Sequence, residues 1–492
     1  MTHPVPTRRL LDMLQDAGQL VATRGALPPV VTGLTDDSRN VVPGTAFVAV
    51  RGSVHDGHDY LADAADRGMA LALVEDGAAV QGPALIVRAS RTAVALAGRA
   101  FYDDPGRLLT IVGVTGTSGK TTTVSMLRHL FDSPDAPAAS IGTLGVLTGS
   151  DGRPFPGGSG LTTPGPIELQ RVLRALVDAG VRQVAMEVSS HALDQQRVEG
   201  ISFAAAVFTN LSRDHLDYHG TTEAYFAAKA RLVAQAAPGG TAVVNADDDV
   251  WTALPPVPRL VRFGLGPAAA EVRGRDVVFG PSGSAWTLDA GGSTAPVTLP
   301  LIGDFNVSNA LAAAATAWSL GMPVPAIARR LSALPQVPGR LERILDAPVV
   351  LRDYAHKPDA MERALDAVRP FVRRHLIVVF GCGGDRDRGK RPIMGAIAER
   401  KADAVILTSD NPRTEDPERI LDEIESGMTR RDHLRIEDRR DAIARALALA
   451  GEGDVVVLAG KGHETYQIRG TTSTPFDERE VVAALVGARA GQ

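Results

Sequence analysis

The sequence predicts an α/β protein with a central P-loop domain built on a mostly parallel sheet, and a C-terminal domain of the doubly wound, Rossmann-like type. The first observation is length: 492 residues are too many for one hydrophobic core and predict about three domains. The second is that short apolar runs alternate with helical segments, which is typical of parallel sheets. The third is a glycine-rich turn that ends in Lys120, between an apolar run and a helix.

The composition is that of an ordinary globular protein, with 44% apolar and 22% charged residues and a net charge of -5. This balance argues against nucleic-acid binding by bulk charge. The single cysteine, Cys382, excludes an intramolecular disulfide framework and indicates a reducing compartment. Residues 1–19 lack the apolar core of a signal peptide, and no apolar run reaches membrane-spanning length. We therefore expect a cytoplasmic monomer with neither nucleic acid nor membrane as a partner.

Residues 1–108 are expected to form a first, small α/β domain. The runs 46–50, 71–74 and 84–87 indicate short buried strands, with helical segments between them. The sequence Asp-Asp-Ser-Arg at 36–39 precedes the first run and indicates a turn. These residues alone do not indicate what the domain binds.

Residues 109–337 are expected to form the central domain, which begins with a strand, a glycine-rich loop and a helix. Glycines let backbone N–H groups approach phosphate oxygens, and the helix N-terminus adds its positive end. Lys120 would reach the β- and γ-phosphates, and a threonine hydroxyl would bind Mg²⁺. Val114 stands where the common P-loop has glycine, so an ordinary glycine-rich turn is the alternative. The residues expected to hold phosphates are Gly113, Thr115, Gly116, Thr117, Ser118, Gly119, Lys120, Thr121 and Thr122.

Later apolar runs of the central domain end in polar residues. Glu187 closes one run, and Asp214 and His215 follow the next. Because the carboxyl ends of parallel strands meet at one edge of a sheet, Glu187 and His215 are candidate Mg²⁺ ligands beside the phosphate loop. Either residue alone would more often be a surface or capping residue. Short runs with Gly and Pro between residues 264 and 300 predict a small antiparallel patch.

Residues 338–492 are expected to form the doubly wound third domain. Its predicted strands alternate with helices, and each is followed by polar residues. Cys382 is interpreted as a small buried residue and not as a nucleophile. The predicted strands are 349–351, 376–380, 404–407 and 455–458.

A phosphate loop beside metal ligands suits one reaction in particular. A carboxylate condenses with an amine only after it has acquired a leaving group, and the γ-phosphoryl group of ATP provides one as an acyl phosphate. This step needs a phosphate cradle, a metal and positioned cations.

Six motifs stand out along the chain. They are Gly-Val-Thr-Gly-Thr-Ser-Gly-Lys-Thr-Thr at 113–122, Glu-Val-Ser-Ser-His at 187–191, Asn-Leu-Ser-Arg-Asp-His-Leu-Asp-Tyr-His at 210–219, Gly-Arg-Leu-Glu at 339–342, Asp-Tyr-Ala-His-Lys-Pro-Asp at 353–359 and Asp-Asn-Pro-Arg at 410–413. Together they resemble the Mur ligases of peptidoglycan synthesis, in family order from about residue 34 to residue 464. Ser118 stands where the family usually has Asn. The resemblance implies an ATP-dependent ligase that joins meso-diaminopimelate to UDP-N-acetylmuramoyl-L-alanyl-D-glutamate through an acyl phosphate.

The resemblance implies that the first domain binds the UDP-sugar, with Ser38 at the uridine nucleotide. Taken alone, Thr162-Thr163-Pro164 favours a helix N-cap. The residues implied to bind the UDP-muramoyl dipeptide are Asp36, Ser38, Ser53, Val54, His55, Thr162, Thr163, Ser189, Gln195 and Arg197.

By composition, Lys229 is a solvated lysine on a helix face. The resemblance instead implies that CO₂ converts it to N6-carboxylysine, whose carbamate supports the second of a pair of Mg²⁺ ions. A carbamate is an oxygen ligand of the kind that Mg²⁺ prefers, and its formation requires a neutral amine, which partial burial favours. The implied catalytic residues are Lys120, Glu187, His215 and Lys229, and the implied metal ligands are Thr121, Glu187, His215 and the carbamate of Lys229.

The resemblance also assigns the nucleotide and amino-acid contacts. Asn309, Arg340 and Asp353 would contact ATP between the second and third domains, with His356 and Lys357 as candidates for the same cleft. Asp-Asn-Pro-Arg alone indicates a turn, which would present the guanidinium of Arg413 to the distal carboxylate that diaminopimelate has and lysine lacks. The implied diaminopimelate ligands are Arg386, Asp410, Asn411, Pro412, Arg413, Gly460 and Glu464.

Two other functions compete with this interpretation. A folylpolyglutamate synthase shares the variant loop and the ligase chemistry, but the motifs at 36–39 and 410–413 argue against it. A P-loop switch ATPase would need no acceptor domain and would hydrolyse ATP without an amino acid. Three substrates on separate domains predict domain closure, with hinges near residues 108 and 338.

Overall fold

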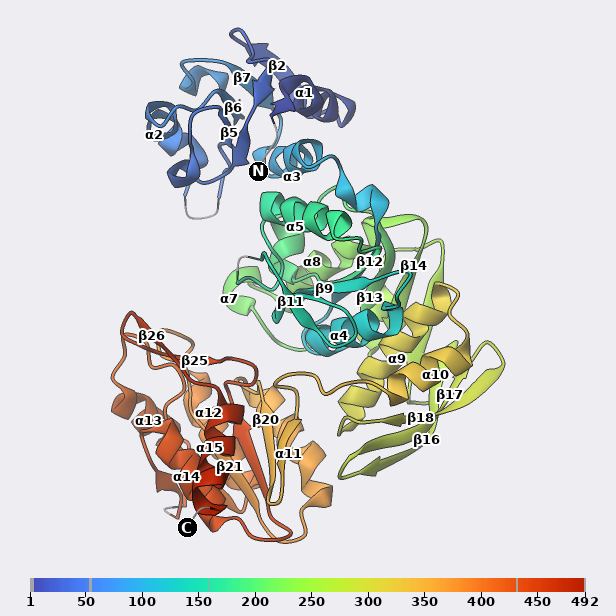
Figure 1. Cartoon of the computed structure of the whole chain (residues 1–492), viewed down its shortest axis with the longest axis vertical. Helices are drawn as coiled ribbons and strands as arrows, with labels where there is room; N and C mark the ends of the chain where they lie inside the picture. The colour runs from blue at the N-terminus through green and yellow to red at the C-terminus, as the bar shows by residue number, and fades with distance from the viewer. Residues whose placement is uncertain (1–3, 53–54, 159, 431, 491–492) are drawn as a thin grey trace. The chain divides into compact units, whose positions relative to one another are not determined.

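The structure is a computed structural model that describes residues 4–52, 55–158, 160–430 and 432–490. The chain divides into two compact units, each made of several segments. Figure 1 colours the ribbon by residue number from the N-terminus to the C-terminus. The predicted domain divisions after residues 108 and 337 remain predictions. Among the described residues, no helix has both the length and the apolar character to cross a membrane. The first unit comprises Met1–Gly274, Leu288–Ala295 and Ser308–Arg330, and the second comprises Arg275–Thr287, Pro296–Val307 and Leu331–Gln492.

The N-terminal part of the first unit holds a five-stranded sheet of order β2-β7-β6-β5-β4. Strands β4 to β7 are parallel, and β2 pairs antiparallel with β7. Helices α1 and α3 share a core with one face of the sheet. The short strands β1 (Val5–Pro6) and β3 (Val30–Val31) form a separate pair. The other elements are α1 (Thr7–Asp16), β2 (Leu20–Arg24), β4 (Gly33–Thr35), β5 (Thr45–Val48), α2 (Leu61–Asp66), β6 (Leu71–Val74), β7 (Ala84–Val87) and α3 (Ser90–Phe101).

An eleven-stranded sheet follows, of order β11-β10-β9-β12-β8-β13-β14-β15-β16-β17-β18. The neighbouring strands β9, β12, β8, β13, β14, β15 and β16 pair in parallel. Strand β10 pairs antiparallel with both β9 and β11. The short runs predicted between residues 264 and 300 therefore extend the central sheet. The strands are β8 (Thr110–Thr115), β9 (Ala138–Gly142), β10 (Gly145–Thr148), β11 (Arg153–Phe155), β12 (Gln183–Glu187), β13 (Phe203–Phe208), β14 (Ala236–Asn245), β15 (Leu260–Gly264), β16 (Val272–Gly280), β17 (Gly283–Ala290) and β18 (Ser293–Leu299).

Helices cover both faces of the parallel strands. The apolar stripe of α5 and part of α8 pack with the strands in one core, while α4 contacts β8, β9 and β12 on the other side (Figure 1). Both faces are covered, so these strands are nearly continuous in apolar residues and do not alternate. The helices are α4 (Lys120–Phe131), α5 (Pro166–Asp178), α6 (Ser190–Asp194), α7 (Leu216–His219), α8 (Thr222–Ala234), α9 (Asp304–Ser319) and α10 (Val324–Ser332).

The second unit contains a six-stranded sheet of order β19-β20-β24-β21-β22-β23, parallel except for β19. Helices α11, α12 and α13 pack on one face, and α14 and α15 pack on the other. This doubly wound arrangement confirms the predicted fold class. The elements are β19 (Glu342–Asp346), β20 (Val349–Asp353), α11 (Pro358–Val368), β21 (Leu376–Phe380), α12 (Lys390–Lys401), β22 (Ala404–Leu407), α13 (Pro417–Glu425), β23 (Leu434–Arg435), α14 (Arg439–Leu449), β24 (Val455–Ala459), β25 (Tyr466–Arg469), β26 (Thr472–Pro475) and α15 (Glu478–Ala490).

A buried ion pair joins the carboxyl ends of two strands of this sheet. The guanidinium of Arg439 and the carboxylate of Glu478 are both fully buried and lie 2.7 Å apart. Arg439 also donates hydrogen bonds to the carbonyl oxygens of Ser409, at 3.4 Å, and Ala459, at 2.9 Å. Ser409 and Ala459 directly precede Asp410 and Gly460, so the ion pair holds the backbone on which these two candidate site residues stand.

Replacing Glu478 with Gln should destabilise the second unit strongly. Arg439 would keep its buried charge without a counterion, and breaking one partner of such a pair costs about 3 to 5 kcal/mol. Urea unfolding of the full chain would measure this loss in the free energy of unfolding. Glu480→Gln, at an exposed position on the same helix, should change that free energy by less than about 0.5 kcal/mol. Similar losses for both variants would contradict this role of the pair.

Candidate active site

The phosphate loop connects β8, which ends at Thr115, with α4, which begins at Lys120. Gly116 and Gly119 have φ values of 149° and 85°, in the region that favours glycine. A Cβ atom at Gly116 would clash with the hydroxyl of Thr209, and one at Gly119 would clash with the amide oxygen of Asn309. These glycines are therefore required both by backbone conformation and by close packing.

Two residues that follow β13 hold this loop in place. Thr209 Oγ1 donates to the carbonyl oxygen of Ser118 at 2.7 Å, and Asn210 Oδ1 accepts from Ser118 N at 2.9 Å. The backbone N–H of Thr117 donates to Asn210 O at 2.8 Å. Thr209 and Asn210 were not among the predicted site residues, although Asn210 opens one of the motifs that the sequence shows. Their position after a strand that pairs with β8 was the signal that would have identified them.

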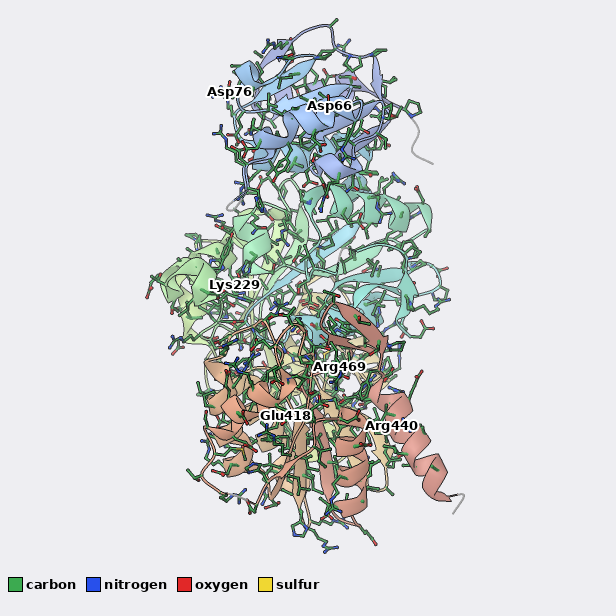
Figure 2. The ribbon with its side chains drawn as sticks, turned by 90° about the vertical axis from the view of Figure 1, so that its left-hand side faces the viewer. Asp66, Asp76, Lys229, Glu418, Arg440 and Arg469 are labelled. Carbon is green, nitrogen blue, oxygen red and sulfur yellow. The ribbon has the colours of Figure 1, made fainter. Side chains whose placement is uncertain are left out.

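Two lysines meet at one backbone oxygen in the loop. Lys120 Nζ and Lys229 Nζ each donate to Gly116 O at 2.8 Å, and Lys120 also donates to Thr117 O at 3.0 Å. Lys229 lies on α8 and is 1% exposed, so the interpretation as a solvated helix-face lysine is wrong. Figure 2 shows Lys229 in the central part of the chain. The ring of Tyr225, one helical turn earlier, lies 4.5 Å from Lys229 Nζ, and its hydroxyl lies 3.2 Å from Thr117 Oγ1.

Glu187 lies at the end of β12, next to the phosphate loop. Its carboxylate is buried, with 2% of the residue exposed, so it is not a surface residue. It accepts hydrogen bonds from Thr121 Oγ1 at 2.9 Å and from the backbone N–H of Thr143 at 2.8 Å. Thr121, in the first turn of α4, is therefore in direct contact with the carboxylate at the end of β12. This contact agrees with the prediction that the strand ends meet beside the phosphate loop.

His215 precedes α7 in the left-handed conformation, with φ at 52° and a side chain that is 42% exposed. Its ring centroid lies 4.8 Å from that of His191 and 6.3 Å from that of Tyr225. The ring of His219 contacts His191 and Tyr225 as well. Burial lowers the pKa values of His191 and His219, which favours the neutral form of both rings. The quoted motifs at 187–191 and 210–219 contain His191, His215 and His219, but the sequence does not show that these two motifs meet in space.

The oxygen donors beside the loop fit Mg²⁺. Among the described residues, no three His, Cys, Asp or Glu side chains are grouped closely enough to hold a metal by themselves. Mg²⁺ keeps several waters and is usually bound by one or two carboxylates together with substrate phosphates. The Glu187 carboxylate, in contact with the Thr121 hydroxyl, is a donor set of this kind.

Four of the predicted dipeptide ligands, Thr163, Ser189, Gln195 and Arg197, are connected by hydrogen bonds near the carboxyl end of β12. Thr163 Oγ1 donates to Glu187 O at 2.9 Å and accepts from Ser189 N at 3.1 Å. Arg197 donates to Thr163 O at 2.9 Å and to Gln195 Oε1 at 2.6 Å. The N-cap of α5 is Gly165, without a side-chain cap, so the interpretation of Thr162-Thr163 as a helix cap is wrong. Thr162 Oγ1 lies 3.2 Å from Thr143 Oγ1.

Three further predicted dipeptide ligands, Asp36, Ser38 and His55, belong to the N-terminal part of the first unit. Ser38 is buried in a 3₁₀ turn whose N-cap is Asp37, which accepts a hydrogen bond from Arg39 N at 3.0 Å. Asp36 and His55 are exposed. Ser53 and Val54 lie outside the described residues.

The predicted nucleotide contacts are distributed over both units. Asn309 Oδ1 lies 3.5 Å from Thr123 Oγ1 in the first unit, next to the phosphate loop. In the second unit, Asp353 Oδ2 accepts from Leu341 N at 2.7 Å, and burial raises the pKa of Asp353 to about 6. The Arg340 guanidinium lies 5.0 Å from the ring centroid of Tyr354. Burial lowers the pKa of His356 to about 4, so this histidine is neutral.

The predicted amino-acid ligands gather at the carboxyl ends of β22 and β24. Asp410 and Asn411 are buried, and Asn411 Nδ2 donates to Glu464 Oε2 at 2.8 Å. A Cβ atom at Gly460 would lie 2.5 Å from Asp410 Oδ2, which explains why this position is glycine. Arg413 has a φ of 52°, and its Nη1 donates to Gly384 O at 2.9 Å.

Two further residues complete this region. Arg386 is exposed and donates to Asp385 O at 3.1 Å, and Pro412 is buried. Cys382 is buried, and burial raises the pKa of its thiol to about 12. A thiol with that pKa is protonated at neutral pH, in agreement with its interpretation as a packing residue.

Comparison with known proteins identifies the class. Residues 30–101 match the Mur ligase family catalytic domain, residues 114–317 the Mur ligase middle domain, and residues 339–462 the Mur ligase glutamate ligase domain. These matches cover most of the chain, and a relative of this family is 45% identical to it over 92% of its length. The chain therefore belongs to the Mur ligase family and is a ligase.

Individual relatives indicate which members of the family the chain resembles. The chain is 45% identical over 475 residues to the UDP-N-acetylmuramoyl-L-alanyl-D-glutamate–2,6-diaminopimelate ligase of Synechococcus elongatus, covering 92% of this chain and 94% of the relative. A solved structure of a ligase with that name superposes with a TM-score of 0.69 at 34% identity, covering 94% of this chain and 97% of the other. The folylpolyglutamate synthase of Mycobacterium tuberculosis, solved with ADP, has a TM-score of 0.62 at 21% identity over 75% of this chain and 91% of its own, a likeness of fold alone.

Replacing Gly119 with Ala should weaken ATP binding by about tenfold or more, because the new Cβ would displace Asn309 from the loop. Gly180→Ala is the matched control: Gly180 has nearly the same φ, 86°, but no atom lies within 4 Å of its Cβ position. Both variants should lose about 1 to 2 kcal/mol of stability from the backbone conformation. Calorimetric titration with ATP separates the two effects, and equal ATP affinities for both variants would contradict the packing argument.

Proposed function

We propose that this chain catalyses the ATP-dependent addition of meso-2,6-diaminopimelate to UDP-N-acetylmuramoyl-L-alanyl-D-glutamate, in the cytoplasmic synthesis of peptidoglycan precursors. The observation that carries the proposal is the match, over nearly the full length of both chains, to ligases named for this reaction. The arrangement of Lys120, Glu187 and Thr121 around the phosphate loop supports the same chemistry.

The reaction begins at the phosphate loop. The backbone N–H groups of the loop and the N-terminus of α4 bind the phosphates of ATP, and Lys120 neutralises charge on the β- and γ-phosphates. The carboxylate of D-glutamate attacks the γ-phosphorus, ADP leaves, and an acyl phosphate forms. The neutral amine of diaminopimelate then attacks the acyl carbon, the nitrogen loses one proton to solvent, and phosphate leaves with the C–O bonding pair. Glu187, Thr121 and His215 would hold Mg²⁺, which supplies charge neutralisation for the transferred phosphoryl group.

Lys229 would take part as a carbamate. Its burial disfavours the charged amine and so favours the neutral form that reacts with CO₂. The resulting N6-carboxylysine would offer anionic oxygens beside the loop, suited to the second of a pair of Mg²⁺ ions. The bond from Lys229 Nζ to Gly116 O already directs this side chain at the phosphate site.

The three substrates would be divided among three domains in a monomer. Residues 1–108 would bind the UDP-sugar through Ser38 and its neighbours, residues 109–337 would bind ATP, and residues 338–492 would bind diaminopimelate. Domain closure about hinges near residues 108 and 338 would bring the substrates together and exclude water from the acyl phosphate.

Phosphate release in the presence of the UDP-muramoyl dipeptide and ATP tests this proposal directly. Release should be fast with meso-diaminopimelate, slow with lysine and slow with neither, because the acyl phosphate needs the correct amine to turn over. The product is checked by mass spectrometry. Equal rates in all three reactions would exclude the ligase and favour a nucleotide-hydrolysing switch, and stimulation by folate with glutamate would favour a folylpolyglutamate synthase.

Arg413→Ala should raise the KM for diaminopimelate about 100-fold. The reason is the loss of hydrogen bonds between two charged groups, which contribute about 3 kcal/mol. The KM for ATP should stay unchanged. Arg440→Ala is the control, since Arg440 is an exposed arginine at the start of α14 in the same unit (Figure 2). An unchanged KM for diaminopimelate in Arg413→Ala would rule out its role in selecting the distal carboxylate.

A further inference from the structure

A fully buried lysine lies among the residues proposed to bind the amino acid. Lys461 follows β24, and its side chain is 0% exposed. Its Nζ donates to Asn411 Oδ1 at 3.1 Å and lies 3.6 Å from Glu464 Oε2. Asn411 Nδ2 in turn donates to the same Glu464 oxygen at 2.8 Å. The ammonium, the amide and the carboxylate therefore form a closed triangle of polar contacts.

This triangle determines how the amide of Asn411 is oriented. Asn411 Oδ1 accepts hydrogen bonds from Lys461 Nζ and also from the backbone N–H of Ile468, at 3.0 Å. With both donors on Oδ1, the NH₂ group must point toward Glu464. Ile468 lies on β25 next to Arg469, whose place in the second unit Figure 2 shows. The carbonyl oxygen of Ile468 accepts a hydrogen bond from the backbone N–H of Arg413 at 3.1 Å. Ile468 is therefore hydrogen-bonded to both Asn411 and Arg413.

Charge makes Lys461 more than a packing residue. Asp410 and Glu464 place two carboxyl groups in one partly buried region, where burial, and after it the presence of Asp410, raises the pKa of Glu464. A buried carboxylate without a nearby cation tends to take up a proton. Burial lowers the pKa of Lys461 itself, while its position beside Glu464 lowers the pKa of that carboxyl group and so opposes the effects of burial and of Asp410. A carboxylate held in one position by neighbouring groups can pair with the ammonium group of an amino acid.

We propose that Lys461 is a positioning residue for the amino-acid substrate, acting through Asn411 and Glu464. Its ammonium holds the Asn411 amide and the Glu464 carboxylate in the one arrangement that meets the substrate's ammonium and carboxylate groups. This inference rests on the proposed function of the second unit as the amino-acid site. It assigns Lys461 no contact with the substrate and no part in bond formation.

Kinetics of the full-length Lys461→Met variant test the proposal. Methionine keeps the apolar stem and removes the ammonium. The KM for meso-diaminopimelate should rise about tenfold or more, while kcat and the KM values for ATP and the UDP-muramoyl dipeptide stay within about twofold. Lys401→Met is the matched control. Lys401, on α12, forms an ion pair with Asp366 at 2.8 Å, and neither residue is a proposed ligand of the amino acid. It should leave all four constants unchanged.

A double-mutant cycle distinguishes positioning from general stabilisation. If Lys461 acts through Asn411, then Lys461→Met in an Asn411→Ala background should raise the KM for diaminopimelate by less than about threefold further. Lys461→Gln provides a second variant should Lys461→Met fail to fold, since an amide keeps a donor for Asn411. Its KM for diaminopimelate should lie between those of the wild type and of Asn411→Ala.

The outcomes separate this inference from the function on which it rests. A folded Lys461 variant with wild-type KM for diaminopimelate, or one in which all three KM values rise together, would overturn the positioning role. Fully multiplicative effects in the double-mutant cycle would overturn it too. If wild-type phosphate release does not depend on diaminopimelate, the proposed function fails and this inference fails with it.

Discussion

The carbonyl oxygen of Gly116 is the point on which the first unit's site depends. It accepts hydrogen bonds from Lys120, which belongs to the loop itself, and from Lys229, which α8 brings from a distant part of the sequence. This arrangement requires a glycine at 116, because a side chain there would meet Thr209, and it requires Lys229 to be buried. A buried amino group needs hydrogen-bond partners, so the loop and α8 stabilise each other while they shape the site.

Both units use parallel strands to gather polar groups. In the first, the ends of β8, β12 and β13 bring the loop together with Glu187 and Thr209. In the second, the ends of β22 and β24, the two strands that pair with β21 on either side, bring Asp410 next to Gly460. The carboxyl ends of neighbouring parallel strands necessarily lie at one edge, so residues distant in sequence become neighbours without long loops. The apolar strands behind them supply a rigid support for the polar edge.

Buried charges in this protein are held by several partners at once. Glu187 accepts hydrogen bonds from two threonines. Lys461 donates a hydrogen bond to Asn411 and forms an ion pair with Glu464. Arg439 pairs with Glu478 and donates to backbone oxygens. Burying a charge without such partners would cost several kcal/mol, so each partner set is a condition for the charge to remain. The same partner sets restrict the side chains to one orientation, which is what substrate recognition needs. Stability and positioning therefore have a common physical origin in these sites.

The sequence by itself determined the local features: the apolar runs that became β6, β7, β21 and β22, the loop ending at Lys120, and the motifs that mark the family. Each of these depends on residues close together in the chain, where strand periodicity, glycine conformation and motif spacing are visible. Only the tertiary structure decided that Lys229 is buried, that Thr163 binds the end of β12 and caps no helix, and that Lys461 connects Asn411 with Glu464. Burial and hydrogen-bond partners depend on segments that meet through packing, and local sequence patterns carry no record of which segments will meet.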